Sequence, residues 1–143
     1  MNVALCSDEE WLLSEEAFLI YASSMYHPTY EAFEIQMEGF LKDPSVKVFV
    51  CEDQGEKIGM MVLKYSNTVA VISGFAVHEK LQCRGIGRYM IQFVLESVSP
   101  ERLEAQTDDD SVEFYRKCGF AVEQIVVDYP NDHVIRYNCV LNK

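Results

Sequence analysis

Basic residues are scarce in this sequence, and their scarcity excludes one class of partner. The 143 residues contain 12 Lys and Arg against 23 Asp and Glu, so the formal net charge is -11. A surface of this sign repels a phosphate backbone, and we therefore expect no nucleic acid among the partners.

Long hydrophobic runs are also missing. No apolar segment approaches the roughly 18 residues that identify a membrane-spanning helix. The first six residues, Met1–Cys6, are too few and too weakly charged for a secretory leader. The sequence predicts a protein that has no membrane partner and is cytoplasmic.

The five cysteines lie far apart, and no C-x-x-C pair occurs. An odd number without close spacing argues against a disulfide framework and against a zinc site. We expect reduced thiols and no metal. Cys6, Cys51 and Cys139 lie in apolar runs and are predicted in the core, whereas Cys83 lies in a loop.

What is present fits one domain over residues 1–143, since 49% of the chain is hydrophobic and no linker or repeat interrupts it. Apolar periodicity and turn residues predict about seven strands and about four helices. The expected strands cover residues 2–5, 46–52, 57–65, 68–77, 102–106, 120–127 and 133–141, the last two joined by a turn at 129–132. The expected helices cover residues 8–23, 29–41, 87–98 and 111–118. This alternation predicts an α/β fold of the α+β type, with a mixed, mostly antiparallel sheet flanked by helices.

The segment Gln82-Cys83-Arg84-Gly85-Ile86-Gly87 lies between the apolar run Val69–Val77 and the amphipathic run Gly87–Val98. Two glycines one residue apart allow a tight turn and close approach of a ligand to the backbone. The first amides of the helix that follows have no intrahelical partner, and they suit a pyrophosphate. The alternative is an ordinary strand-turn-helix connection that happens to use glycine.

A second motif follows downstream in Phe114-Tyr115-Arg116-Lys117-Cys118-Gly119-Phe120. Together the two motifs resemble those of the GNAT superfamily, the acetyl-CoA-dependent N-acyltransferases. Gln82-x-x-Gly85-x-Gly87 is similar to its pyrophosphate motif, [Q/R]-x-x-G-x-[G/A], and the downstream segment is similar to its F-Y-x-x-x-G-F motif.

The resemblance implies a single GNAT-like domain whose sheet splays apart between strands four and five, with acetyl-CoA as cosubstrate. It also implies a possible homodimer, which is common in that family. The pantetheine arm would pair with the fourth strand, and the pyrophosphate would bind the loop after it. The cofactor-binding residues expected on this basis are Phe75, Ala76, Val77, Gln82, Cys83, Arg84, Gly85, Ile86, Gly87 and Arg88.

Attack of an amine on a thioester needs a deprotonated amine, stabilisation of the developing oxyanion and a proton for the departing thiolate. The resemblance places Tyr115 near the cofactor sulfur, where its phenol would supply that proton. The alternative for Tyr115 is a core aromatic residue. The candidate bases are Glu104 on the fifth strand, Glu79 just past the fourth, or His27 and Tyr30 between the first two helices. The alternative for each is an exposed surface residue.

The acidic residues cluster early, since residues 1–56 contain twelve acids and two bases. If the first two helices form a wall of the acceptor site, as the resemblance implies, this charge would attract a cationic amine. The candidate substrate-binding residues are His27, Tyr30, Glu31 and Glu34. The alternative is a solvated face that promotes solubility.

Two functions follow from these patterns. The first is an N-acetyltransferase that moves an acetyl group from acetyl-CoA to a primary amine, on a small molecule or a peptide, by direct attack. The second is a non-catalytic acyl-CoA-binding module or sensor that has the same fold.

Overall fold

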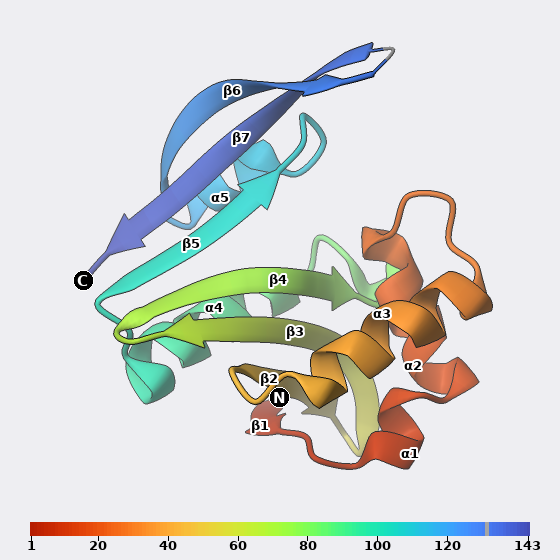
Figure 1. Cartoon of the computed structure of the whole chain (residues 1–143). Coiled ribbons are helices and arrows are strands. Elements are labelled where there is room, and N and C mark those ends of the chain that lie inside the picture. The colour runs from red at the N-terminus through yellow and green to blue at the C-terminus, as the bar shows by residue number, and fades with distance from the viewer. Residues whose placement is uncertain (131) are drawn as a thin grey trace.

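Seven strands and five α-helices make up the part of the chain that the computed structural model describes, residues 1–130 and 132–143 (Figure 1). The strands are β1 (Asn2–Leu5), β2 (Val46–Asp53), β3 (Glu56–Ser66), β4 (Val69–Val77), β5 (Arg102–Thr107), β6 (Ala121–Tyr129) and β7 (Asp132–Asn142). The α-helices are α1 (Glu9–Leu12), α2 (Glu15–Tyr21), α3 (Tyr30–Lys42), α4 (Ile86–Phe93) and α5 (Val112–Lys117). Short 3-10 turns cover Ala22–Ser24 and Glu79–Leu81, and α4 continues into a π-helical turn over Val94–Val98.

The strands form one sheet in the order β1-β2-β3-β4-β5-β7-β6. Only β4 and β5 are parallel, and every other neighbouring pair is antiparallel. The mixed, mostly antiparallel sheet predicted from the sequence is therefore confirmed. Of the turn expected between the last two strands, Asn131 lies outside the described residues.

Helices cover both faces of the sheet, with α1, α2 and α3 on one face and α4 on the other (Figure 1). Along β2, Val48 and Val50 belong to the core under α1–α3, whereas Phe49 and Cys51 belong to the core under α4 and α5. Because both faces are buried, β2 is apolar at successive positions and does not alternate with polar residues.

The single helix predicted over residues 8–23 is wrong, because the chain breaks at Ser14 into α1 and α2. The hydroxyl of Ser14 accepts from the N–H of Ala17 and donates to the carbonyl of Trp11, so one residue ends the first helix and caps the second. The cap of α1 is Asp8, whose carboxylate accepts from the N–H of Trp11. This break raises the number of α-helices from the expected four to five.

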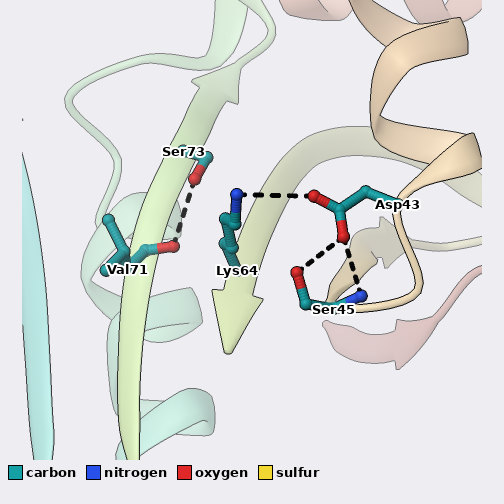
Figure 2. Close-up of polar contacts among 5 residues, drawn as sticks. All are labelled: Asp43, Ser45, Lys64, Val71 and Ser73. Atoms are coloured by element: carbon teal, nitrogen blue, oxygen red, sulfur yellow. Dashed lines mark hydrogen bonds and ion pairs between the residues drawn. The ribbon is translucent and has the colours of Figure 1, made fainter. Parts of the chain in front are cut away.

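Helix α3 matches its prediction, and a polar cluster ties its end to the sheet (Figure 2). Asp43 accepts from both the N–H and the hydroxyl of Ser45, at 2.9 and 2.6 Å. Its second oxygen lies 3.4 Å from Nζ of Lys64 on β3. The Ser45 hydrogen bonds, and then Lys64, lower the pKa of Asp43.

The sheet opens between β4 and β5, as the two strands in Figure 1 show. Their pairing is limited to Val69–Ile72 on β4 and Arg102–Ala105 on β5. At the next residue, Ser73, the register of β4 with β3 shifts, because Ile72 faces Leu63 and Gly74 faces Val62. The Ser73 hydroxyl turns back along its own strand, 3.5 Å from the carbonyl oxygen of Val71 (Figure 2).

Gly74 follows this bulge and is needed because Tyr21 of α2 packs against it. A Cβ at Gly74 would lie 2.0 Å from the Tyr21 hydroxyl oxygen and 2.9 Å from Cζ. The ring of Tyr21 is 2% exposed and is held by Phe33, with ring centroids 5.7 Å apart. The contact brings α2 close to β4 at the point where β5 departs.

We expect Gly74→Ala to destabilise the protein by about 1–3 kcal/mol, because the added methyl must displace a buried ring. Urea unfolding measures the loss. Adding Tyr21→Phe removes the nearest atom and should recover part of the stability. The control is Gly39→Ala in α3, where an added Cβ meets nothing within 4 Å. This substitution should stabilise the helix by up to about 1 kcal/mol. Equal effects of the two alanines would contradict the contact.

Candidate active site

A cleft with a volume of about 1190 Å³ occupies the opening between β4 and β5. Its lining includes the last residues of β4, the end of α2 with the turn after it, and one face of α3. The loop before α4, the end of β5 and helix α5 complete it. The cleft therefore joins the two faces of the sheet.

At one end of the cleft, Gly85 begins helix α4 in the left-handed conformation, with φ of 83°. No side chain of the described residues caps this helix, so its first amides have no intrahelical partner. A Cβ at Gly85 would meet nothing within 4 Å. The backbone here is open toward the cleft and suits an anionic group.

Gly87 is needed for a different reason from the one the sequence suggested. A Cβ at this position would lie 3.0 Å from Cε1 of Phe114, which in turn packs edge-on against Phe75 with centroids 5.8 Å apart. Gly87 thus allows α4 to approach α5 closely. Of the two glycines in the motif, only Gly85 combines a positive φ with open space.

The end of β4 is held from two sides. Ser23, after α2, and Gln82, in the loop before α4, each donate a side-chain hydrogen bond of 3.1 Å to the carbonyl of Val77. On the β5 side of Ser73–Val77, no strand of the described chain pairs with β4. This edge of the strand is the floor of the cleft.

Tyr115 lines the cleft from α5, and its ring packs edge-on between Phe114 and Phe120 with centroids 5.2 Å from each. Burial, and to a lesser extent the nearby Cys139, Cys118 and Asp108, raise the pKa of its phenol well above the ordinary value. The phenol is therefore protonated at neutral pH and can donate a proton.

The structure brings together most of the cofactor-binding residues predicted from the sequence. Those that line the cleft are Phe75, Ala76, Val77, Gln82, Cys83, Gly85, Ile86, Gly87 and Arg88, together with the predicted acid Tyr115. Arg84 is exposed in the same loop but is not part of the lining. The thiol of Cys83 is exposed, whereas Cys51 and Cys139 are buried.

The predicted bases lie outside this lining. Glu104, on β5, pairs with Arg102 at 3.0 Å. Glu79 is exposed in the turn after β4. Neither carboxylate belongs to the cleft.

The predicted substrate-binding residues, His27, Tyr30, Glu31 and Glu34, also lie outside the lining. The hydroxyl of Tyr30 donates to the carbonyl of Leu13, and its ring packs against Phe18. Helix α3 faces the cleft with Ala32 and Gln36 instead.

Sequence reasoning missed several cleft residues. From the α2–α3 side these are Tyr21, Met25, Tyr26 and Gln36, and from the loop after β5 they include Asp108 and Asp110. The spacing of four between Ala32 and Gln36 placed them on one helical face, but no local pattern showed that this face meets β4.

Within the described residues, no three His, Cys, Asp or Glu side chains are grouped to hold a metal ion. Among the helices of the described chain, none has the length and apolar character to cross a membrane.

A family model for the acetyltransferase (GNAT) family matches residues 10–120. The chain belongs to the GNAT acetyltransferase family. No curated protein matches this GNAT chain.

Solved structures share the fold over nearly the whole GNAT chain. A GNAT family acetyltransferase from Elizabethkingia anophelis, solved with acetyl-CoA bound, is 16% identical, with a TM-score of 0.70 and coverage of 99% of this chain and 97% of that one. A chimera of spermidine N-acetyltransferase from Vibrio cholerae with hSSAT is 18% identical, with a TM-score of 0.73 and coverage of 99% and 96%. The ribosomal-protein-S18-alanine N-acetyltransferase from Escherichia coli is 14% identical, with a TM-score of 0.72 and coverage of 99% and 92%.

Two buried phenols give this GNAT protein a defined sensitivity to alkaline pH. Burial raises the pKa of Tyr21 to about 12, an effect that Ser24 partly offsets, and raises the pKa of Tyr115 further. The stability that the neutral phenols contribute is complete below the unfolded-state pKa of about 10. It is lost as pH rises from there through the folded-state values.

We therefore expect the free energy of unfolding to fall above pH 10 by about 1.4 kcal/mol per pH unit for each phenol. Urea titrations at a series of pH values measure the slope, which should be shallower in Tyr21→Phe. Tyr26→Phe is the control, since Tyr26 is 90% exposed and its loss should leave the slope unchanged. Parallel slopes for wild type and Tyr21→Phe would show that Tyr21 titrates normally.

Proposed function

We propose that this GNAT chain is an N-acetyltransferase that uses acetyl-CoA and a primary amine. The observation that carries the proposal is the continuity of the cleft. It runs from the open amides at the start of α4, along the unpaired edge of β4, to the protonated phenol of Tyr115.

The residues present fit acetyl-CoA. The left-handed Gly85 and the amides after it would hold the pyrophosphate, with Arg84 and Arg88 supplying positive charge. The unpaired edge of β4 near Phe75 would hydrogen-bond the amide-containing arm, as a neighbouring strand would, whereas the carbonyl of Val77 is already bonded to Ser23 and Gln82. When bound, the cosubstrate supplies the acetyl group as a thioester.

Transfer forms a bond between the amine nitrogen and the acetyl carbon and breaks the bond from that carbon to sulfur. The nitrogen loses one proton and the sulfur gains one. Tyr115 lines the cleft and would donate its phenolic proton to the sulfur; its raised pKa keeps the phenol protonated at neutral pH but makes it a weaker acid, so the transfer relies on the position of the hydroxyl beside the sulfur. Backbone N–H groups of β4 would stabilise the carbonyl oxygen. The cleft carboxylate of Asp110 would take the proton of the amine, whereas that of Asp108 already accepts from the N–H groups of Asp110 and Ser111.

We expect Tyr115→Phe to lower kcat by about 100- to 10,000-fold while leaving the KM for acetyl-CoA nearly unchanged, because only the proton donor is removed. Thiol release under conditions where chemistry limits the rate is the measurement. Wild-type kcat in a folded Phe variant would reduce Tyr115 to a packing residue.

We expect Gly85→Ala to weaken acetyl-CoA binding by about tenfold or more, because a methyl group enters the space over the first amides of α4. Calorimetry measures the affinity. Gly55→Ala is a matched control, since Gly55 has a similar φ of 79°, equally open surroundings and a place in the β2–β3 turn. The two variants share the backbone strain, so equal affinities in both would argue against the cradle.

A non-catalytic acyl-CoA-binding module is the second candidate, because none of the predicted bases, Glu79, Glu104, His27 and Tyr30, lines the cleft. The two functions differ in one measurement. Thiol release that depends on an added amine supports the enzyme, whereas acetyl-CoA binding without release from a broad acceptor panel supports the module.

A further inference from the structure

The α2–α3 wall of the cleft carries no charge among the described residues that line it. Tyr21, Ser23, Ser24, Met25 and Tyr26 line it from the end of α2 and the segment after it, and Ala32 and Gln36 line it from α3. This wall belongs to the part of the chain that holds most of the negative charge. It is neutral because the residues that α2 and α3 contribute to the lining are uncharged, while the acids of these helices lie outside the lining.

None of the acids of α3, Glu31, Glu34 and Glu38, lines the cleft. Glu34 and Glu38 are each displaced by two residues, or about 200° around the helix, from the face that carries Ala32 and Gln36. Both acids lie near Tyr30, where, after burial, they raise the pKa of its phenol. The acids of α3 therefore lie outside the cleft lining, and two of them lie near Tyr30.

The charged side chains of the lining come from other elements. Asp108 and Asp110 follow β5, Arg88 and Lys117 belong to α4 and α5, and Arg136 belongs to β7. The two carboxylates can attract an ammonium group at the end of β5. A second positive charge held against the α2–α3 wall would have no acidic partner there.

The wall offers hydrogen bonds and apolar surface instead. The side-chain amide of Gln36 donates to the Tyr21 hydroxyl at 3.2 Å, which leaves the Gln36 carbonyl oxygen for other partners. Met25 and the ring of Tyr26, which is 90% exposed, continue the wall outward. These groups suit an acceptor whose part next to the wall is uncharged and partly apolar.

We propose that the acceptor carries a single amine next to an uncharged apolar or aromatic group and is not a polycation. The proposal rests on the transferase function proposed above and names its substrate class. It narrows the cationic acceptor that the charge of the first 56 residues suggested to an amine with a single positive charge.

Amine binding to the full protein saturated with CoA tests the wall directly. By calorimetry, 2-phenylethylamine should bind about tenfold or more tightly than spermidine. Its affinity should change less than about twofold between low and moderate salt, because one charge rather than three is engaged. Tighter binding of spermidine would overturn the proposal.

Gln36→Glu adds one negative charge to the wall with almost no change of shape. We expect it to tighten spermidine binding by about tenfold and to make that affinity salt-dependent. The matched control is Glu38→Gln on the same helix, which should leave both affinities within about twofold of wild type. An unchanged preference in Gln36→Glu, or an equal shift in Glu38→Gln, would show that the wall does not select the acceptor.

Thiol release measured in parallel separates this proposal from the proposed function. If 2-phenylethylamine binds but no amine causes thiol release, the proposed transferase function is rejected and the proposed preference of the wall for an uncharged group is supported. Faster release with spermidine would retain the transferase and reject the neutral acceptor. Faster release with 2-phenylethylamine than with spermidine, together with a smaller difference between the two amines in Gln36→Glu, would support both.

Discussion

The site depends on the end of hydrogen bonding between β4 and β5 after Ile72. Two parallel strands would normally continue to pair, and the backbone groups freed by their separation must find other partners. The bulge at Ser73 changes the direction of β4, and Tyr21 packs into the space that Gly74 leaves beside it. The same separation creates the cleft, its unpaired floor and its access from both faces of the sheet.

Packing on each side holds this opening in place. On one side, the close approach of Gly87 to Phe114 joins α4 to α5, and Phe114 and Phe120 fix the ring of Tyr115. On the other side, Ser23 ties the segment after α2 to the carbonyl of Val77. The cleft is therefore bounded by elements that are packed and hydrogen-bonded to one another, which suits a site that must position two substrates.

Positive, negative and uncharged side chains line different sides of the cleft. Positive side chains such as Arg88 lie on the α4–α5 side, carboxylates such as Asp108 follow β5, and the α2–α3 wall is neutral among its described residues. An overall charge of -11 therefore says little about the field within the site. Because exposed charges are screened within about 8 Å at physiological ionic strength, the orientation of each helix decides which acids a ligand meets.

The sequence by itself determined the features that arise from local backbone chemistry. The turn at Gly85, the helix after it, the limits of α3 and the apolar runs of β2 and β3 follow from residues close together in the chain, and all could be predicted. The break at Ser14 was missed because a serine within an amphipathic run is compatible with a continuous helix. Only the tertiary structure decided that Tyr21 meets Gly74, that Gly87 meets Phe114, and that α3 turns Gln36 rather than Glu34 toward the cleft. The physical reason is that these contacts join segments tens of residues apart, and a helical period specifies which residues share a face but not what that face meets.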